Sequence, residues 1–146
     1  MNKKLDSVFH SVDECKESGH PCKMSRKNIH YIYKPDKGIK DTSIPKTLFS
    51  GKIQPKLADC VIIYNEDKLA IVEIKCGTVT KRLVNETFEK IENVFKILKH
   101  KDLSPTKILL VYSKYDDSKL RQYVQGKSFF GLRIIDKKYE NNALEI

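Results

Sequence analysis

The clearest pattern along the chain is a pair of apolar runs separated by a short polar segment. The runs cover residues 57–64 and 68–77, and both are rich in β-branched residues. Runs of this length and composition are typical of buried β-strands. Because only residues 65–67 separate them, the two runs predict an antiparallel β-hairpin that is covered on both faces.

The rest of the chain alternates between helical and strand-like spacing of apolar residues. Apolar positions three and four residues apart predict an amphipathic helix over 81–100, for which Thr78 or Thr80 is the expected N-cap. The other expected elements are a helix at 3–17, a strand at 28–33, a long loop at 34–56, a strand at 106–113, a short helix at 116–125 and a strand at 132–135. The order α-β-β-β-α-β-α-β predicts an α/β fold with a mixed central sheet flanked by helices.

Three charged residues interrupt the two apolar runs. Asp59 lies in the first run, and Glu73 and Lys75 lie two residues apart in the second. Charged side chains are costly to bury in a sheet unless they are paired or bind a metal. Since side chains alternate along a strand, Glu73 and Lys75 share one face, and Asp59 can meet them across the hairpin. The pattern predicts two carboxylates and one ammonium in a single pocket.

These groups suit metal-assisted cleavage of a phosphodiester bond. Carboxylates are typical ligands of Mg²⁺ or Mn²⁺, and the backbone carbonyl of Ile74 is a further candidate ligand. The metal would lower the pKa of a bound water and hold the phosphate, while the lysine would orient the water or stabilise the transition state. The alternative is that Glu73 and Lys75 form a solvated ion pair of little energetic value, which the apolar residues around them disfavour.

Asp59 followed by Glu73-x-Lys75 on a hairpin, and then a helix, resembles the PD-(D/E)xK nuclease superfamily. The resemblance implies a restriction-endonuclease-like core of order α-β-β-β-α-β, covering residues 1–113 of a single domain. It also implies that Asp59 and Glu73 bind Mg²⁺ or Mn²⁺ and that Lys75 is the catalytic lysine. The expected activity is metal-dependent endonuclease cleavage of nucleic acid, with DNA favoured over RNA.

The sequence departs from the family pattern at two places. Ala58 stands before Asp59, where the family usually has a proline, and Pro55 lies four residues upstream of Asp59. The family also often places Gln or another polar residue on the helix after the hairpin. No Gln occurs between Lys56 and Arg121. The role is therefore unfilled or falls to Asn85, Glu86 or Glu89.

Size and element order are most similar to the archaeal Holliday-junction resolvases, which makes branched DNA the first expected substrate. Those enzymes carry an acid in the first helix, for which Asp13 is favoured over Asp6, and a basic segment with a serine, for which Ser43 and Ser50 are counterparts. Cutting both strands would require a two-fold homodimer. Restriction-type, repair and RNA-cleaving nucleases are alternatives. So is an inactive nuclease-fold module that binds nucleic acid or a protein partner.

Most of the positive charge is concentrated in one segment. Residues 20–56 hold nine Lys or Arg and two Asp, so they carry +7 of the formal net charge of +9. This basic, loop-rich segment leads directly into the strand that contains Asp59. A basic approach to a metal site suits a polyanionic substrate, whose phosphates supply affinity. The alternative is an ordinary lysine-rich surface.

Length, composition and cysteines favour an intracellular, cytoplasmic protein of one domain. The chain has 146 residues and no apolar run long enough to span a bilayer. Its four cysteines form no C-x-x-C pair, so Cys60 and Cys76 are expected to be buried apolar groups and all four thiols to be free. A Zn²⁺ site made of Cys15, His20, Cys22 and His30 matches no familiar spacing.

Overall fold

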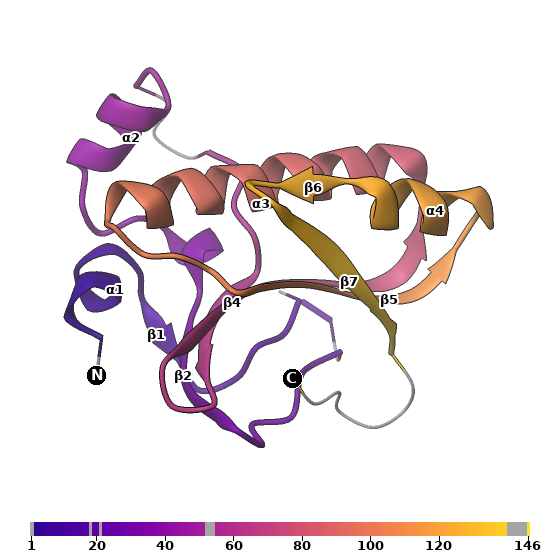
Figure 1. The fold of residues 1–146 in the computed structure, drawn as a ribbon, viewed down its shortest axis with the longest axis horizontal. Coiled ribbons are helices and arrows are strands. Elements are labelled where there is room, and N and C mark those ends of the chain that lie inside the picture. Colours follow the sequence, from indigo (N-terminus) through magenta and orange to yellow (C-terminus); the bar gives the residue numbers. More distant parts are fainter. Residues whose placement is uncertain (1, 18, 21, 52–54, 140–145) are drawn as a thin grey trace.

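A mixed β-sheet forms the centre of the computed structural model, which describes residues 2–17, 19–20, 22–51, 55–139 and 146. Its strands are β1 (Ser11–Val12), β2 (Ile29–Tyr33), β3 (Cys60–Tyr64), β4 (Lys68–Val79), β5 (Lys107–Tyr115), β6 (Ser128–Phe129) and β7 (Leu132–Lys138). The seven strands lie in the order β1-β2-β3-β4-β5-β7-β6 (Figure 1). Neighbouring strands are antiparallel except for the parallel pairs β4–β5 and β5–β7. The predicted mixed sheet is confirmed.

The helices connect these strands. They are α1 (Lys3–Val8), α2 (Ser43–Leu48), α3 (Lys81–His100) and α4 (Lys119–Gly126), with a 3₁₀ turn η1 (Pro35–Lys37) between β2 and α2. The predicted hairpin is confirmed as β3–β4, in which Cys60 pairs with Val72. Helix α3 then crosses over to the parallel strand β5, as parallel pairing requires. Its N-cap is Thr80, whose side chain accepts a hydrogen bond from Leu83 N at 3.2 Å.

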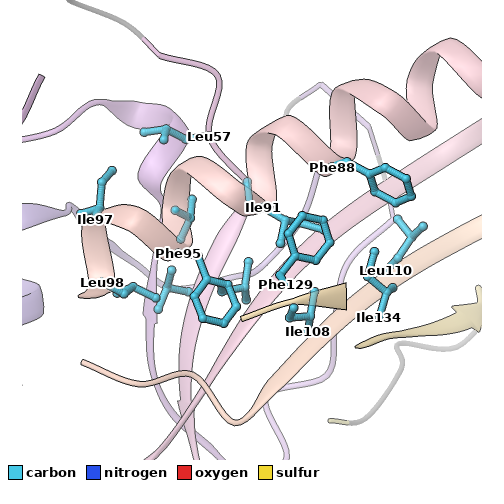
Figure 2. Close-up of a cluster of buried hydrophobic side chains, with 14 of the residues drawn as sticks. Leu57, Phe88, Ile91, Phe95, Ile97, Leu98, Ile108, Leu110, Phe129 and Ile134 are labelled. Carbon is cyan, nitrogen blue, oxygen red and sulfur yellow. The ribbon is translucent and has the colours of Figure 1, made fainter. Parts of the chain in front are cut away.

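One face of the sheet is covered by helices. Figure 2 shows Ile91 and Phe95 of α3 directed toward Ile108 and Leu110 of β5, within the larger apolar cluster of the protein. All four α-helices contribute buried side chains to this cluster. Because apolar residues recur on one side of α3 at intervals of three and four, the whole length of the helix can pack on the sheet.

The opposite face is covered by the loop that precedes β2. Its cluster contains Cys15, Cys22 and Met24 from that loop and, among the residues that the structure describes, none from a helix. Two disulfides attach the loop to the sheet: Cys15–Cys60 and Cys22–Cys76, with Cα atoms 5.9 and 5.7 Å apart. Two faces of one sheet are therefore covered by different means.

The prediction of four free thiols was wrong, since no described cysteine is free. Cys60 is buried as expected, but Cys76 is partly exposed. The cysteines meet because the N-terminal segment folds back across the sheet, which their spacing in the sequence does not reveal. The cysteines therefore give no support for a reducing cytosol. No helix in the described parts of the chain is long and apolar enough to cross a membrane.

The predicted helix over 3–17 was too long, because α1 ends at Val8. The apolar residues of this segment pack on opposite sides of the sheet: Leu5 and Val8 join the helix-covered cluster, whereas Val12 and Cys15 join the other. Residues 11–12 pair with β2 instead. Strand pairing and the Cys15 disulfide replace the second half of the expected helix.

The segment 34–56 was predicted to be a loop, but its described part contains η1 and α2. Pro45 suggested irregular structure, yet it lies at the third position of α2. A proline is tolerated there because the first backbone N–H groups of a helix have no intrahelical partner.

Candidate metal and active site

Asp59, Glu73 and Lys75 come together on the helix-covered face of the sheet. Asp59 directly precedes β3, while Glu73 and Lys75 alternate with apolar residues along β4. Glu73 is fully buried and Asp59 is 5% exposed, and the Lys75 side chain is 13% exposed. The sequence pattern therefore identified a real cluster of charges inside the protein.

Two hydrogen bonds fix the carboxylates relative to each other. Ile74 N donates to Asp59 Oδ2 at 2.8 Å, and Asp59 N donates to Glu73 Oε1 at 3.1 Å. Each acid is thus held by the backbone of the strand that carries the other. The backbone N–H and C=O of one strand residue point to the same side, so the Ile74 carbonyl also faces the Asp59 side of β4.

The second oxygen of Glu73 has no hydrogen bond but lies among cations. Glu73 Oε2 is fully buried and is 3.2 Å from Lys90 Nζ and 3.8 Å from Lys75 Nζ. Lys90 comes from α3, and its side chain is 21% exposed. A buried carboxylate oxygen with charge partners but no hydrogen bond is a candidate ligand atom for a cation.

Lys90 is the residue of α3 that reaches the site, and sequence reasoning missed it. Its position gave a signal: it lies three residues after the buried Thr87 and four before the buried Val94, on the edge of the apolar face of α3. The three residues considered for this role point elsewhere. Asn85 accepts a hydrogen bond from Tyr123, while Glu86 and Glu89 lie 3.9 and 4.0 Å from Lys56.

Asp36 supplies a third carboxylate that was also missed. It lies in η1, its side chain is 26% exposed, and its Oδ1 is 3.2 Å from Lys34 Nζ. Burial raises the pKa of Asp36, and the charge of Asp59 raises it further, whereas Lys34 and Lys90 act in the opposite direction. Asp36 therefore interacts electrostatically with Asp59.

The negative charge of Asp59 opposes ionisation of Glu73. Burial raises the pKa of Glu73 well above its usual value, and the charge of Asp59 and a hydrogen bond with its side chain raise it further. Burial lowers the pKa of Lys90, but the charges of Glu73 and Asp59 and hydrogen bonding with Glu73 and Lys75 together outweigh it and raise that pKa. Two close carboxylates that resist joint ionisation are stabilised by an added cation.

A pocket of about 300 Å³ opens beside the cluster. Its lining includes Asp36, Lys37, Lys56 and Lys90, so one wall is shared with the charged cluster through Lys90. Three lysines and one acid give the pocket a net positive charge, which suits an anionic ligand.

The residues present fit Mg²⁺ or Mn²⁺. Asp59, Glu73 and the Ile74 carbonyl form a set of hard oxygen donors, and Glu73 Oε2 lacks a hydrogen bond. In the structure, the ammonium of Lys90 is the cation next to Glu73 Oε2. Because Lys90 also lines the pocket, its side chain has space to move away from Glu73, and a metal ion could then bind the carboxylate.

The two acids expected from the first helix lie apart from these contacts. Asp6 accepts a hydrogen bond from Tyr33 Oη at 2.8 Å. Asp13 follows β1 rather than lying on a helix, and its carbonyl accepts a hydrogen bond from Arg26. Of the expected serines, Ser43 donates to Asp41 at 2.6 Å, and Ser50 lines a second pocket next to Lys56.

Comparisons with protein-family models, curated proteins and solved structures find no match for this chain. Its function is therefore inferred from the geometry and chemistry of the site.

Proposed function

We propose that the protein is a divalent-metal-dependent endonuclease of the PD-(D/E)xK type, with a restriction-endonuclease-like fold, that hydrolyses phosphodiester bonds in DNA. The observation that carries the proposal is the buried Asp59–Glu73 pair next to Lys75, with Glu73 Oε2 lacking a hydrogen bond. The hairpin β3–β4 followed by α3 and a parallel strand β5 is compatible with that fold.

The side chains of the site have separate roles in this proposal. Asp59, Glu73 and the Ile74 carbonyl hold Mg²⁺ or Mn²⁺, which when bound supplies an acidified water and neutralises charge on the phosphate. Lys75 orients the attacking water or stabilises the negative charge that develops on the phosphate oxygens. Lys90 keeps its proton because the charge of Glu73 raises its pKa, and so it offers a second positive charge.

The basic residues around the pocket would receive the nucleic acid. Lys37 and Lys56 line the pocket, and the Lys56 side chain is 54% exposed. Contacts from lysines to phosphates give affinity without sequence preference and weaken as salt rises.

A four-way junction is the first substrate proposed, and a homodimer is proposed because two strands must be cut. A nucleic-acid substrate is also the remaining reason to expect a cytoplasmic location.

One observation favours a second candidate, an inactive module that binds nucleic acid or a protein. Lys90 and Lys75 already neutralise Glu73, so the network can exist without a metal. Against this candidate stands the cost of burying charges, because an apolar group of similar size would be at least as stable in their place. A binding module has no physical need for these carboxylates beside a phosphate.

The two candidates differ in metal dependence. Labelled linear duplex, single-stranded and four-way-junction DNA, and one RNA, are incubated with the protein in Mg²⁺, in Mn²⁺ or in excess chelator. The nuclease proposal predicts cleavage of at least one DNA with metal and none with chelator. Binding of nucleic acid without cleavage in any of these conditions would contradict it and favour the inactive module.

A further inference from the structure

A second group of potential ligands lies on the opposite face of β4. Glu17, His20 and Cys76 bring one ligand atom each to within 4.8 Å of one another. His20 Nε2 is 3.4 Å from Glu17 Oε1, and Cys76 N donates to the same oxygen at 3.3 Å. Cys22 joins the group through its disulfide with Cys76. Three side chains thus converge at one point and Cys22 is bonded to one of them, and all four are of types that bind Zn²⁺.

The spacing of these atoms suits a tetrahedral ion. With metal–oxygen and metal–nitrogen bonds near 2.1 Å, two ligand atoms in a tetrahedral zinc site lie about 3.4 Å apart. The Glu17–His20 separation has this value. Cys22 N also donates to Cys76 Sγ at 3.2 Å, and hydrogen bonds of this kind orient and stabilise a metal-bound thiolate.

The two disulfides differ in exposure to a reductant. Both cysteines of Cys15–Cys60 are fully buried. Cys76 is partly exposed, and His20 next to it is an exposed residue with 52% of its side chain accessible. Because thiol–disulfide exchange requires access of a thiolate to sulfur, Cys22–Cys76 is the bond that a soluble dithiol reduces first.

We propose that Cys22–Cys76 is a reversible bond whose reduced form is a Zn²⁺ site made of Cys22, Cys76, His20 and Glu17. A dithiol gives two electrons and two protons to the Cys22–Cys76 disulfide and leaves as a disulfide itself. Zn²⁺ then binds both sulfurs, and two protons are released to solvent. Either state ties the N-terminal loop to β4, so the attachment next to Lys75 persists in both redox conditions.

This site differs from the zinc set considered from the sequence. Cys15 is bonded to the buried Cys60, and His30 lies on β2 and is absent from the group. Cys76 and Glu17 take their places, and His20 and Cys22 are common to both sets. The proposal is independent of the nuclease function, because it concerns a soft metal site on the other face of β4 and is measured by binding rather than cleavage.

The test uses the full chain, with the state of each disulfide mapped by alkylation and mass spectrometry. Zinc bound after dialysis is measured for the oxidised protein and for protein treated with a phosphine reductant under anaerobic conditions. We expect one Zn²⁺ per reduced chain and none per oxidised chain. Cys76→Ser should abolish binding, and His20→Ala should weaken it by more than the roughly 10-fold that loss of an outer-shell partner costs. His30→Ala and Cys15→Ser/Cys60→Ser are the matched controls and should bind as the wild type does.

Absence of zinc from the reduced, folded protein would overturn the proposal, as would equal binding by His20→Ala and His30→Ala. If reduction unfolds the protein, thermal unfolding of the reduced chain with and without Zn²⁺ decides the matter. The proposal then predicts recovery of a cooperative transition with Zn²⁺. An unfolded chain in both samples would contradict it.

Discussion

The two faces of β4 carry different kinds of side chain. Toward α3, the strand presents Glu73 and Lys75, which are paired with each other, and Glu73 Oε2 has no hydrogen bond. Away from α3, it presents Val72 and Ile74 within an apolar cluster, followed by Cys76 in a disulfide. The second face supplies attachment, whereas the first contains charges that stability alone does not require. This difference is the physical reason to assign chemistry to the first face.

Removing the ammonium of Lys75 should have the largest effect on function after loss of the Glu73 carboxylate. Lys75→Met should lower the rate of metal-dependent cleavage by about 10²–10³-fold, similar to the loss of one electrostatic group that stabilises a transition state. Single-turnover cleavage measures it. Lys96→Met is the control, since Lys96 forms an exposed pair with Glu92. Equal rates for the two variants would remove Lys75 from the mechanism.

Removing the buried disulfide should have the largest effect on stability. Cys15→Ser/Cys60→Ser should lower the free energy of unfolding by about 2–4 kcal/mol, because the bond closes a loop across a separation of 45 residues. Denaturant unfolding measures the change. Cleavage by the folded variant should persist, since this bond lies on the face away from Glu73. A stable variant that cannot cleave would show that the two faces are not separable.

The pH dependence of stability should report the buried carboxylate. The folded-state pKa of Glu73 lies well above its ordinary value of 4.5, so the folded protein binds this proton more tightly than the unfolded chain does. The resulting stabilisation is complete below pH 4.5 and is lost as the pH rises through the folded-state pKa.

Denaturant unfolding of metal-free wild type and Glu73→Gln across this range isolates the effect. Wild type should lose stability relative to the variant as pH rises, and Mg²⁺ should restore part of the loss at neutral pH. Parallel curves for the two proteins would contradict the raised pKa.

The smallest effect concerns Asp6. Tyr33→Phe removes the hydrogen bond to Asp6 and should cost about 1 kcal/mol of stability. Cleavage should be unchanged, because this acid has a structural partner of its own. A fall in the cleavage rate of the folded variant, measured next to its unfolding free energy, would return Asp6 to the list of candidate site residues.

Local patterns predicted the parts of the fold that depend on local spacing. The period of two placed Glu73 and Lys75 on one face of β4, and the period near 3.6 gave α3 its bounds. Thr78 and Thr80 were both candidates for its N-cap, and the structure has Thr80 there. Both signals follow from the repeat of side-chain directions along one strand or one helix, so the local sequence is enough to show them.

The parts that failed depend on contacts between distant segments. The pattern over 3–17 is helical, yet pairing with β2 and the bond to Cys60 made its second half extended. Lys90 and Asp36 enter the site only because α3 and η1 lie against the same end of the sheet. Helical spacing places Lys90 at the edge of the buried face of α3, but nothing in the local sequence identifies Glu73 as the partner of Lys90, or Asp59 as a neighbour of Asp36.

The most direct test of the central claim compares two buried acids in one cleavage assay. Glu73→Gln removes a charge from the proposed metal site, whereas Asp136→Asn removes one from a buried carboxylate bonded to Tyr115 and Gln125, with 3% of its side chain exposed. In Mg²⁺, with folding checked by circular dichroism, Asp136→Asn should cleave DNA at close to the wild-type rate and Glu73→Gln should not cleave. Cleavage by Glu73→Gln at the rate of Asp136→Asn would contradict the account.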